Sequence, residues 1–298
     1  MSLTRRRLRV TITLAPIEGQ SQQTFTGTNA NQVIVQDLRM SAEVLHAGGP
    51  SDGTLDLTIY GLLRSTMNRL STLGMQINLV PKNPIVLEAS NEDGQFGTVF
   101  TGYILAAYAD FNAQPDVAFH ITAHTLTPQS VATVKATSYN GSTDIATIMS
   151  SLATQMSLKF ENIGVTGQLR NPYFAGSLKS QAQQCADAGG FAWNHGDLGT
   201  LAIWPKNGSR DSGQIPLISP STGMKGYPTY TAYGINVETI YNPSIGFGGK
   251  VQVQSSLQAA CGTWAVYGLN HHLECEVPDG NWFSTVMCYN PKFSPPVT

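Results

Sequence analysis

The sequence predicts a mainly β protein with a small α/β insert between two related β-barrel domains. Three observations lead to this fold class. Segments in which apolar and polar residues alternate recur through residues 1–128 and 207–298. Residues 129–206 instead carry apolar side chains at helical spacing, and the last block repeats the layout of the first.

Residues 1–128 are expected to form the first barrel. Residues 54–60 alternate cleanly between apolar and polar side chains, as a strand with one buried face does. Leu63, Met67 and Leu70 recur at helical spacing and predict one short helix. The same alternation predicts the other strands, at residues 10–14, 33–35, 38–45, 85–89, 99–107 and 117–123.

Residues 129–206 are expected to form the α/β insert. Apolar residues between 144 and 156 make a helical stripe, and the carboxylate of Asp144 complements the start of that helix. A second helix is predicted over residues 178–188, with Ser177 as its N-cap and the Gly189-Gly190 pair as its stop. A hairpin follows, with strands at residues 191–194 and 201–204.

The third domain is expected over residues 207–298. Its first part, residues 207–220, is rich in Gly, Ser and Pro and predicts a linker. Alternation returns afterwards and predicts strands at residues 235–241, 250–255, 264–271 and 282–289. Pro278-Asp279-Gly280-Asn281 is a strong turn signal between the last two strands.

An internal repeat relates the first and last blocks. A shift of 165 residues places Val86 on Val251 and Ser90 on Ser255, and it places Gly97-Thr98 on Gly262-Thr263. A shift of 163 residues places Pro115-Asp116 on Pro278-Asp279. The match keeps the strand order and the turn between the long strands, which favours two related domains.

The composition limits the functional classes. Charged residues make up 12% of the chain, about half the roughly 25% of an ordinary soluble domain. The 17 Lys and Arg against 19 Asp and Glu argue against a broad basic face for nucleic acid. No run of 18 apolar residues exists to span a membrane. A surface with few charges suits a protein that other subunits cover.

The basic N-terminus contains Arg5, Arg6, Arg7 and Arg9. Alternating residues follow it rather than the unbroken apolar run of a signal peptide, so we expect a chain that is cytoplasmic at synthesis and not exported through a signal peptide. These arginines could contact a phosphate backbone, but beside an edge strand they more often serve solubility or an interface.

Signatures of catalysis and of metal binding are weak. Nucleophile elbows, P-loops and dinucleotide fingerprints do not occur. His120 and His124 fall on a predicted strand, too far apart to share a metal. The densest ligand cluster is His271, His272 and Glu274, in which only His272 and Glu274 share a face. We therefore expect no catalytic residue, no metal and no cofactor.

For two further groups of residues the sequence predicts only their structural state. His195 lies beside a predicted hairpin turn and is expected to be exposed. The four cysteines show no metal-finger spacing and are expected to be free thiols. They are Cys185, Cys261, Cys275 and Cys288.

The most distinctive stretch resembles a known family. It comprises Thr222 to Thr231, Gly234 to Val237 and Tyr241 to Ile245. With Asn171-Pro172-Tyr173-Phe174 in the middle segment and Pro278-Asp279-Gly280-Asn281-Trp282 near the end, it resembles the central hub proteins of contractile phage-tail baseplates, the late control D type. The resemblance covers residues 130–290 well and the first block by layout.

The resemblance implies a structural role. Hubs of this family are trimers in which each subunit carries two tail-tube-like barrels. Six barrels then adapt a sixfold tail tube to a threefold central spike and surround a channel through which DNA passes. The implied partners are two further copies, the spike, the tube or tube-initiator proteins and the surrounding wedge proteins. The implied location is the virion tail baseplate, assembled in the host cytoplasm, without stable membrane binding.

The loop from Met224 to Tyr230 is our candidate for a contact between subunits or with the spike. It is aromatic and stiffened by proline, and its candidate partner-interface residues are Met224, Tyr227, Pro228 and Tyr230. A linker packed on its own barrel is an equal alternative, because exposed aromatic loops do not always mark interfaces.

Two other functions remain open at this point. A secreted carbohydrate-binding or polysaccharide-degrading β protein would use the four tryptophans to stack on sugars, namely Trp193, Trp204, Trp264 and Trp282. A tail-tube or distal-tail protein would carry one barrel per subunit, which the internal repeat argues against.

Overall fold

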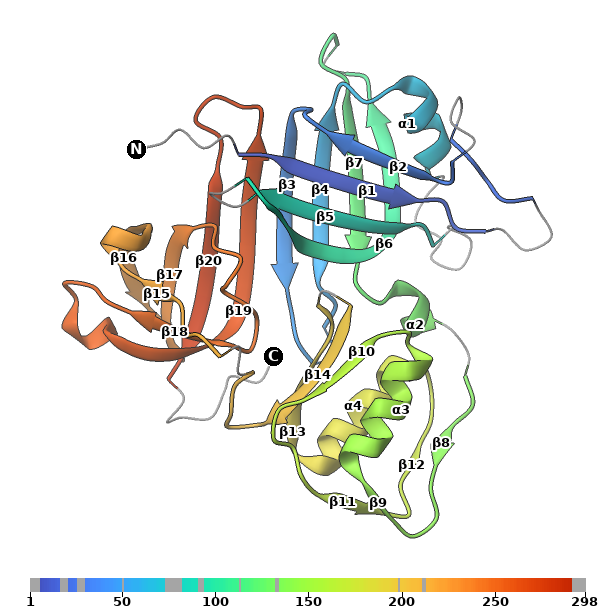
Figure 1. The fold of residues 1–298 in the computed structure, drawn as a ribbon, viewed down its shortest axis with the longest axis vertical. Coiled ribbons are helices and arrows are strands. Elements are labelled where there is room, and N and C mark those ends of the chain that lie inside the picture. Colours follow the sequence, from blue (N-terminus) through green and yellow to red (C-terminus); the bar gives the residue numbers. More distant parts are fainter. Residues whose placement is uncertain are drawn as a thin grey trace. The chain divides into compact units, whose positions relative to one another are not determined.

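The chain folds into two compact units (Figure 1). Unit 1 contains residues 1–45, 54–127 and 271–283, and unit 2 contains residues 46–53, 128–270 and 284–298. The structure is a computed structural model, and it describes residues 6–16, 21–25, 30–49, 51–72, 82–90, 94–112, 114–131, 134–197, 199–210 and 213–290. We describe each unit by itself.

Unit 1 is built on antiparallel strands. Its order is β3-β4-β7-β6-β5-β1-β2, and β1, β3, β4 and β7 alternate buried with less buried residues. Helix α1 (Arg64–Leu70) buries Met67 and Leu70, two of the three residues that predicted it. The strands are β1 (Leu8–Thr13), β2 (Gln32–Gln36), β3 (Met40–His46), β4 (Thr54–Tyr60), β5 (Pro84–Ser90), β6 (Phe96–Asp110) and β7 (Ala118–His124).

A hairpin from far along the chain completes unit 1. The strands β19 (Gly262–Cys275) and β20 (Trp282–Tyr289) form this hairpin, and its tip, residues 271–283, belongs to unit 1. There β19 lies next to β3. Ser41 Oγ donates to Glu274 Oε1 at 3.4 Å, and the Cys275 thiol donates to the carbonyl of Leu38 at 3.3 Å. The hairpin tip therefore provides hydrogen-bond partners on the side of β3 that faces away from β4.

Unit 2 contains the α/β insert, in which α3 (Ile145–Gln155) packs against α4 (Leu178–Gly189). The Asp144 carboxylate accepts the Thr147 N–H, and the Ser177 hydroxyl accepts the Ser180 N–H. Gly190, at φ 68°, ends α4 as predicted. A mixed sheet of order β10-β14-β13 lies in the same insert, formed by β10 (Lys159–Asn162), β13 (Phe191–Asp197) and β14 (Thr200–Pro205).

Short strands complete the insert and were not predicted from the sequence. Two pairs of them bracket the helices, β9 with β11 and β8 with β12. Segments of two or three residues are too short to show a periodic pattern. They are β8 (Thr137–Ser138), β9 (Ser142–Asp144), β11 (Gln168–Arg170) and β12 (Tyr173–Phe174), and one further helical turn, α2 (Thr127–Val131), precedes them.

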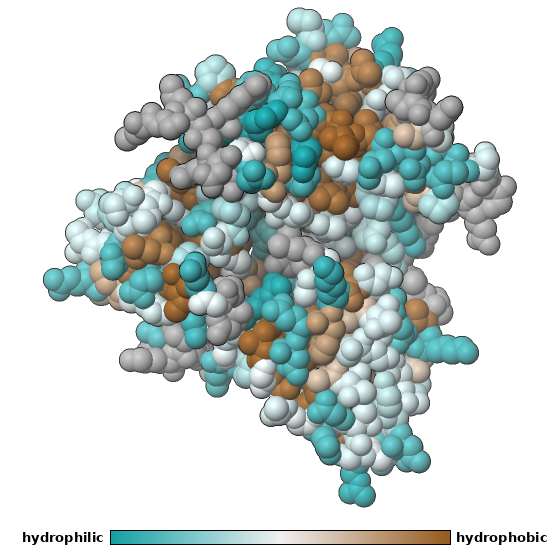
Figure 2. Space-filling view, in the orientation of Figure 1, coloured by the Kyte–Doolittle hydropathy of each residue, from teal (hydrophilic) through white to brown (hydrophobic). Residues whose placement is uncertain are grey.

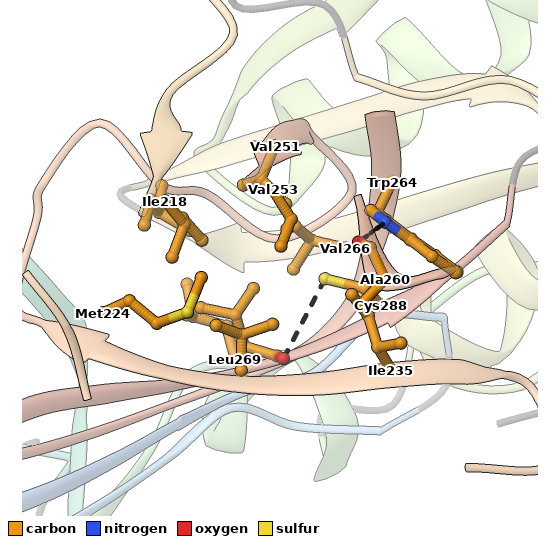
Figure 3. Close-up of a cluster of buried hydrophobic side chains, with 13 residues drawn as sticks. Ile218, Met224, Ile235, Val251, Val253, Ala260, Trp264, Val266, Leu269 and Cys288 are labelled. Carbon is orange, nitrogen blue, oxygen red and sulfur yellow. Dashed lines mark hydrogen bonds between the residues drawn. The ribbon is translucent and has the colours of Figure 1, made fainter. Parts of the chain in front are cut away.

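The rest of unit 2 is a second β block with its own core. Figure 3 shows Ile218, Met224, Val251 and Leu269 converging among the thirteen residues of this core. The indole N–H of Trp264 donates to the Ala260 carbonyl at 2.9 Å, so its polar atom is satisfied inside the block. The strands are β15 (Leu217–Ile218), β16 (Met224–Tyr230), β17 (Gly234–Ile240), β18 (Lys250–Val253), β19 and β20, with 3-10 turns at Pro220–Thr222 and Gln258–Ala260.

The two β blocks share one strand order. The first block runs β3-β4-β7-β6-β5, and the second runs β16-β17-β20-β19-β18. The last three strands of each block fall where the internal repeat places them, since a shift of 165 residues carries the end of β6 at Asp110 onto the end of β19 at Cys275, whereas β16 and β17 lie further along the chain than this shift would place them. The same topology built from weakly similar sequence supports the predicted repeat.

The predicted fold class is confirmed, because strands dominate both blocks and the helices α3 and α4 lie in the small insert. The division into three domains at residues 128 and 206 stays a prediction.

One local expectation was wrong. Residues 224–230 form strand β16 rather than a loop, because Pro228 falls in a β-bulge between Lys225 and Thr229, where the ladder does not need its missing N–H.

Gly234 provides a test of packing in the second block. A Cβ at this position would collide with the carbonyl oxygen of Cys288 and lie 3.0 Å from the Cα of Tyr289, both on the backbone of β20. We expect Gly234→Ala to lower the free energy of unfolding by about 1–3 kcal/mol, because backbone atoms yield poorly to overpacking. Urea unfolding measures the change.

Gly97→Ala is the matched control, because a Cβ at Gly97 on β6 meets nothing within 4 Å. It should stay within about 0.5 kcal/mol of the parent. Equal losses in both variants would contradict the packing of β17 against β20.

Candidate assembly surfaces

The four predicted interface residues all lie on β16 but face different surroundings. Met224 belongs to the core of the second block, and Pro228 is also buried. Tyr227 and Tyr230 are 67% and 58% exposed. Two of the four side chains are therefore available for a contact, while the other two hold the strand in place.

Local backbone geometry presents Tyr227 to solvent. The bulge interrupts the register with β17 between Lys225 and Thr229, and Gly226 adopts a φ of 66°, which suits glycine. On either side the register is regular, and Lys225 Nζ pairs with Glu238 across the strands at 2.9 Å. The exposed tyrosine thus sits on a short distorted segment between two anchored ends.

Further tyrosines extend this surface beyond the predicted residues. Tyr233, in the turn after β16, is 54% exposed, and its ring lies 6.2 Å from that of Tyr267 on β19. Tyr267 in turn lies 6.3 Å from Tyr289 on β20, and burial raises the pKa of both hydroxyls. Sequence reasoning missed Tyr267 because only the pairing of the strands brings it to the tyrosines of the turn. We call Tyr227, Tyr230, Tyr233 and Tyr267 the tyrosine surface.

The N-terminal arginines are engaged within unit 1. Arg7 pairs with Asp37 at 2.9 Å, and Arg9 pairs with Glu88 at 2.6 Å while its guanidinium lies 4.3 Å from the centre of the Phe96 ring. The hydrogen bonds that Arg9 donates to Glu88 raise the pKa of Arg9. Arg6 donates to the carbonyl of Gly280, and Arg5 lies outside the described residues. The three described N-terminal arginines thus have partners within unit 1.

A polar face covers one side of β3, β4 and β7 and the tip of β19. Glu43 stands opposite Asp56 in the register of β3 and β4, which places two like charges side by side. Thr122 Oγ1 donates to Asp56 Oδ1 at 2.9 Å, and His272 Nδ1 lies 3.6 Å from Glu43. We call Glu43, Asp56, His272 and Glu274 the acidic face.

Of the ten strands in the two shared orders, only β16 and β18 contain a basic residue, Lys225 and Lys250. Neither Lys nor Arg occurs in β3, β4, β6, β7, β17, β19 or β20. The same strands hold Glu43, Asp56, Asp110, Glu238 and Glu274. Their charge is therefore of one sign, although the whole chain is nearly balanced.

The histidine clusters do not assemble a metal site among the described residues, where no group of three His, Cys, Asp or Glu side chains converges. His271 is buried, while His272 faces Glu43 and Glu274. His120 instead stacks on Tyr108 with ring centres 5.1 Å apart. The four cysteines are free thiols, as predicted, and burial raises the pKa of Cys185 and Cys288 to about 12.

The tryptophans do not present a sugar-binding platform. Trp193, Trp204, Trp264 and Trp282 are all buried, with exposed fractions between 3% and 9%. A stacking site for sugar rings needs an exposed aromatic face. The carbohydrate-binding alternative therefore loses the residues on which it was based. Figure 2 shows that the visible surface is mostly hydrophilic or neutral, with apolar residues in separate patches.

Comparison with known families decides the identity at family level. The family Baseplate hub gp41 matches residues 8–288, which is nearly the whole chain. The protein belongs to this baseplate hub family. No curated protein matches the chain. Membership gives the hub a structural role in the baseplate of a phage tail, which is also its location.

Solved structures agree with the fold of the hub. A 43 kDa tail protein of prophage MuSo2 from Shewanella oneidensis matches with a TM-score of 0.60 at 8% identity, over 95% of this chain and 99% of that one. A tail protein from Neisseria meningitidis MC58 matches with a TM-score of 0.63 at 9% identity, over 95% and 96%. The E. coli c3393 protein, a component of the type VI secretion system, matches with a TM-score of 0.54 at 8% identity, over 87% and 76%. At such identities the likeness concerns the fold.

The hub also contains a partly buried ionic network that the sequence did not predict. His195 was expected to be exposed, but its side chain is fully buried. The segment before β4 covers it, since Gly49 N–H donates to the Trp193 carbonyl and Asn194 Nδ2 donates to the Ala47 carbonyl, each at 2.8 Å. Ala47 and Gly49 are far from His195 in the sequence, so no local pattern indicated that they would lie near it.

Asp52 is at the centre of the network. Its Oδ1 lies 2.8 Å from Lys179 Nζ and 3.7 Å from His195 Nε2. Burial lowers the pKa of His195 to about 4, and Lys179 lowers it too, while the negative charge of Asp52 acts in the opposite direction. At neutral pH the imidazole is therefore uncharged, and Asp52 pairs with Lys179 alone.

This network predicts a pH dependence of the hub's stability. The unfolded chain binds a proton at His195 near pH 6.5, whereas the folded chain binds it only near pH 4, so stability falls as pH drops through that window. The loss should reach about 3 kcal/mol at its lower end. His195→Gln should remove this part of the dependence, measured by urea unfolding from pH 7 to pH 4. Identical profiles in the two proteins would contradict a neutral buried His195.

Proposed function

We propose that the hub is a homotrimer that presents six β blocks around a central channel. In this arrangement it adapts the sixfold tail tube to the threefold spike of a contractile tail, and DNA passes through the channel. The hub acts by binding and symmetry matching rather than by catalysis. Its partners are two further copies, the spike, the tube or tube-initiator proteins and the surrounding wedge proteins. The hub binds them during assembly in the host cytoplasm.

The shared strand order of the two blocks carries the proposal. A sixfold partner needs six similar surfaces, and three chains supply them only if each chain carries the surface twice. The orders β3-β4-β7-β6-β5 and β16-β17-β20-β19-β18 are two copies of one arrangement within a single chain. A threefold assembly of such chains contains six blocks of similar fold, but its amino-acid sequence repeats only three times around the ring.

The surface chemistry supports a heavily covered subunit. Only 12% of the residues are charged, and the cores of protein interfaces are depleted of charge and enriched in tyrosine. The tyrosine surface has this character, with Tyr227, Tyr230 and Tyr233 each more than half exposed. We assign it to a contact with a neighbouring subunit or the spike, which keeps the predicted role of β16.

The acidic face supports an assignment of the surface that meets DNA. A channel that released DNA quickly would avoid Lys and Arg, because each phosphate contact adds affinity. The strands β3, β4, β7 and β19, which form this face, have no Lys or Arg, and Glu43, Asp56 and Glu274 face outward from unit 1. We therefore assign this face to the wall of the channel. No helix in the described part of the chain is long and apolar enough to cross a membrane.

The oligomeric state tests the proposal directly. Three chains of 32.0 kDa give 3 × 32.0 kDa, about 96 kDa, for a trimer, and light scattering after size exclusion at low protein concentration measures this mass. A hexamer would indicate a tube-type protein instead. A monomer that stays monomeric on adding the spike would remove the symmetry adaptor.

Charge reversal on the acidic face tests the channel assignment. We expect virions that carry Glu43→Lys with Asp56→Lys to assemble and to release DNA several-fold more slowly, because the added cations bind passing phosphates. The rate of DNA release after adsorption measures the effect.

Neutral substitutions provide the matched control. Glu43→Gln with Asp56→Asn should leave release near the parental rate, because they add no cation to the face. Asp187→Lys, at an exposed position on α4, controls for added charge elsewhere. Parental release from virions with Glu43→Lys and Asp56→Lys would contradict the assignment, while an intact trimer mass would leave the hub proposal standing.

A further inference from the structure

Strand β2 ends the sheet of unit 1, and no other described strand pairs with its outer side. Among the described residues its one partner strand is β1, with Val33 opposite Ile12 and Val35 opposite Val10. The Leu14 N–H donates to the Asn31 carbonyl in the same register. In an antiparallel pair every second residue bonds inward, so Val33 and Val35 bond to β1, while the residues between them point their peptide groups away from it.

Three residues of β2 therefore present free peptide groups. These are Gln32, Ile34 and Gln36, and the structure bonds the N–H and C=O of none of them to another described residue. The Ile34 side chain is 60% exposed on the same strand. A row of unpaired donors and acceptors beside an exposed apolar side chain is a template for pairing with another strand.

The edge of β2 also lacks the usual protection against pairing. Natural edge strands carry charges, prolines or bulges, or they are covered. The sequence Gln-Val-Ile-Val-Gln has no charge, no proline and no bulge. By contrast, β16 has Lys225, Pro228 and a bulge, and β13, which also ends a sheet, is covered where Gly49 bonds to Trp193. Of these three strands at sheet ends, only β2 is free to form backbone hydrogen bonds with another strand.

We infer that β2 pairs with β2 of a second copy of this chain. The sequence Gln-Val-Ile-Val-Gln reads the same in both directions, so antiparallel pairing places Ile34 opposite Ile34 and Gln32 opposite Gln36. Such a contact is isologous, with the same patch on both partners around a twofold axis. It satisfies the free peptide groups of both strands and covers the exposed Ile34 side chains.

A second copy fits this edge better than an unrelated strand. The edge carries no charge that would select an acidic or basic segment, and self-complementarity is the property it does show. A twofold contact joins chains of different threefold rings, so it pairs two hub trimers if the proposed trimer is right, and two single chains if it is not. Five residues on each side make a small interface, and we expect association that depends on concentration.

The mass of the hub over a concentration series tests the inference. The parent protein should rise to twice its low-concentration mass in sedimentation equilibrium, while Ile34→Lys should stay at the lower mass, because pairing would set two lysines opposite each other. Leu63→Lys is the control, since Leu63 is 72% exposed just before α1, and it should behave as the parent.

The comparison does not depend on the size of the basic unit, so it is separate from the test of the trimer. Equal masses for the parent and Ile34→Lys at every concentration would overturn the inference. So would a parental self-association in Ile34→Lys together with lost incorporation into baseplates, which would instead indicate that β2 receives a strand of another tail protein.

Disulfide trapping gives a second readout that tolerates a weak contact. In a Cys261→Ser background, which removes the exposed thiol, Ile34→Cys should form covalent dimers under mild oxidation because the two side chains meet at the twofold axis. Leu63→Cys in the same background should stay largely monomeric in non-reducing gels. Equal crosslinking in both variants would contradict pairing at β2.

Discussion

Unit 1 depends on the pairing of β3 with the tip of the β19–β20 hairpin. The backbone N–H and C=O groups of an interior strand need hydrogen-bond partners on both sides, and β4 provides them on only one side of β3. On the other side the partners are more than 200 positions away: Ser41 donates a hydrogen bond to Glu274, and the Leu38 carbonyl accepts one from Cys275. Without that hairpin, β3 would be one more open edge, and Ala42 and Val44 would lose part of their cover.

The same constraint orders the remaining edges of the sheet. At β16 the chain resists pairing through Pro228 and a bulge, whereas at β2 nothing resists it. Among the described residues, the edges of β3, β16 and β2 are thus filled, blocked and open, respectively. The two β blocks share a strand order but differ at their edges.

Periodicity in the sequence was sufficient for most of the fold. Residues 54–60 were predicted as a strand because their buried face alternates strictly, and Ser177 and Gly190 marked the ends of α4 because their cap chemistry is local. The repeat came from the spacing of turns and strands. The failures have a different cause. Pro228 concealed β16 because a proline is tolerated in a bulge, and His195 is buried near Ala47, Gly49 and Asp52, which no local pattern connects to it. The tyrosine surface was found in part, since Tyr227 and Tyr230 are neighbours in sequence but Tyr267 meets Tyr233 only through strand pairing.

The origin of the hairpin tip has a consequence for synthesis. Residues 271–283 complete the sheet at β3, so the first block cannot reach its final structure until those residues have left the ribosome. Contacts of such separation in sequence form late and slow folding. The first block therefore waits, with β3 exposed, while more than 200 further residues are synthesised, and during that interval a chaperone or another strand can reach that edge.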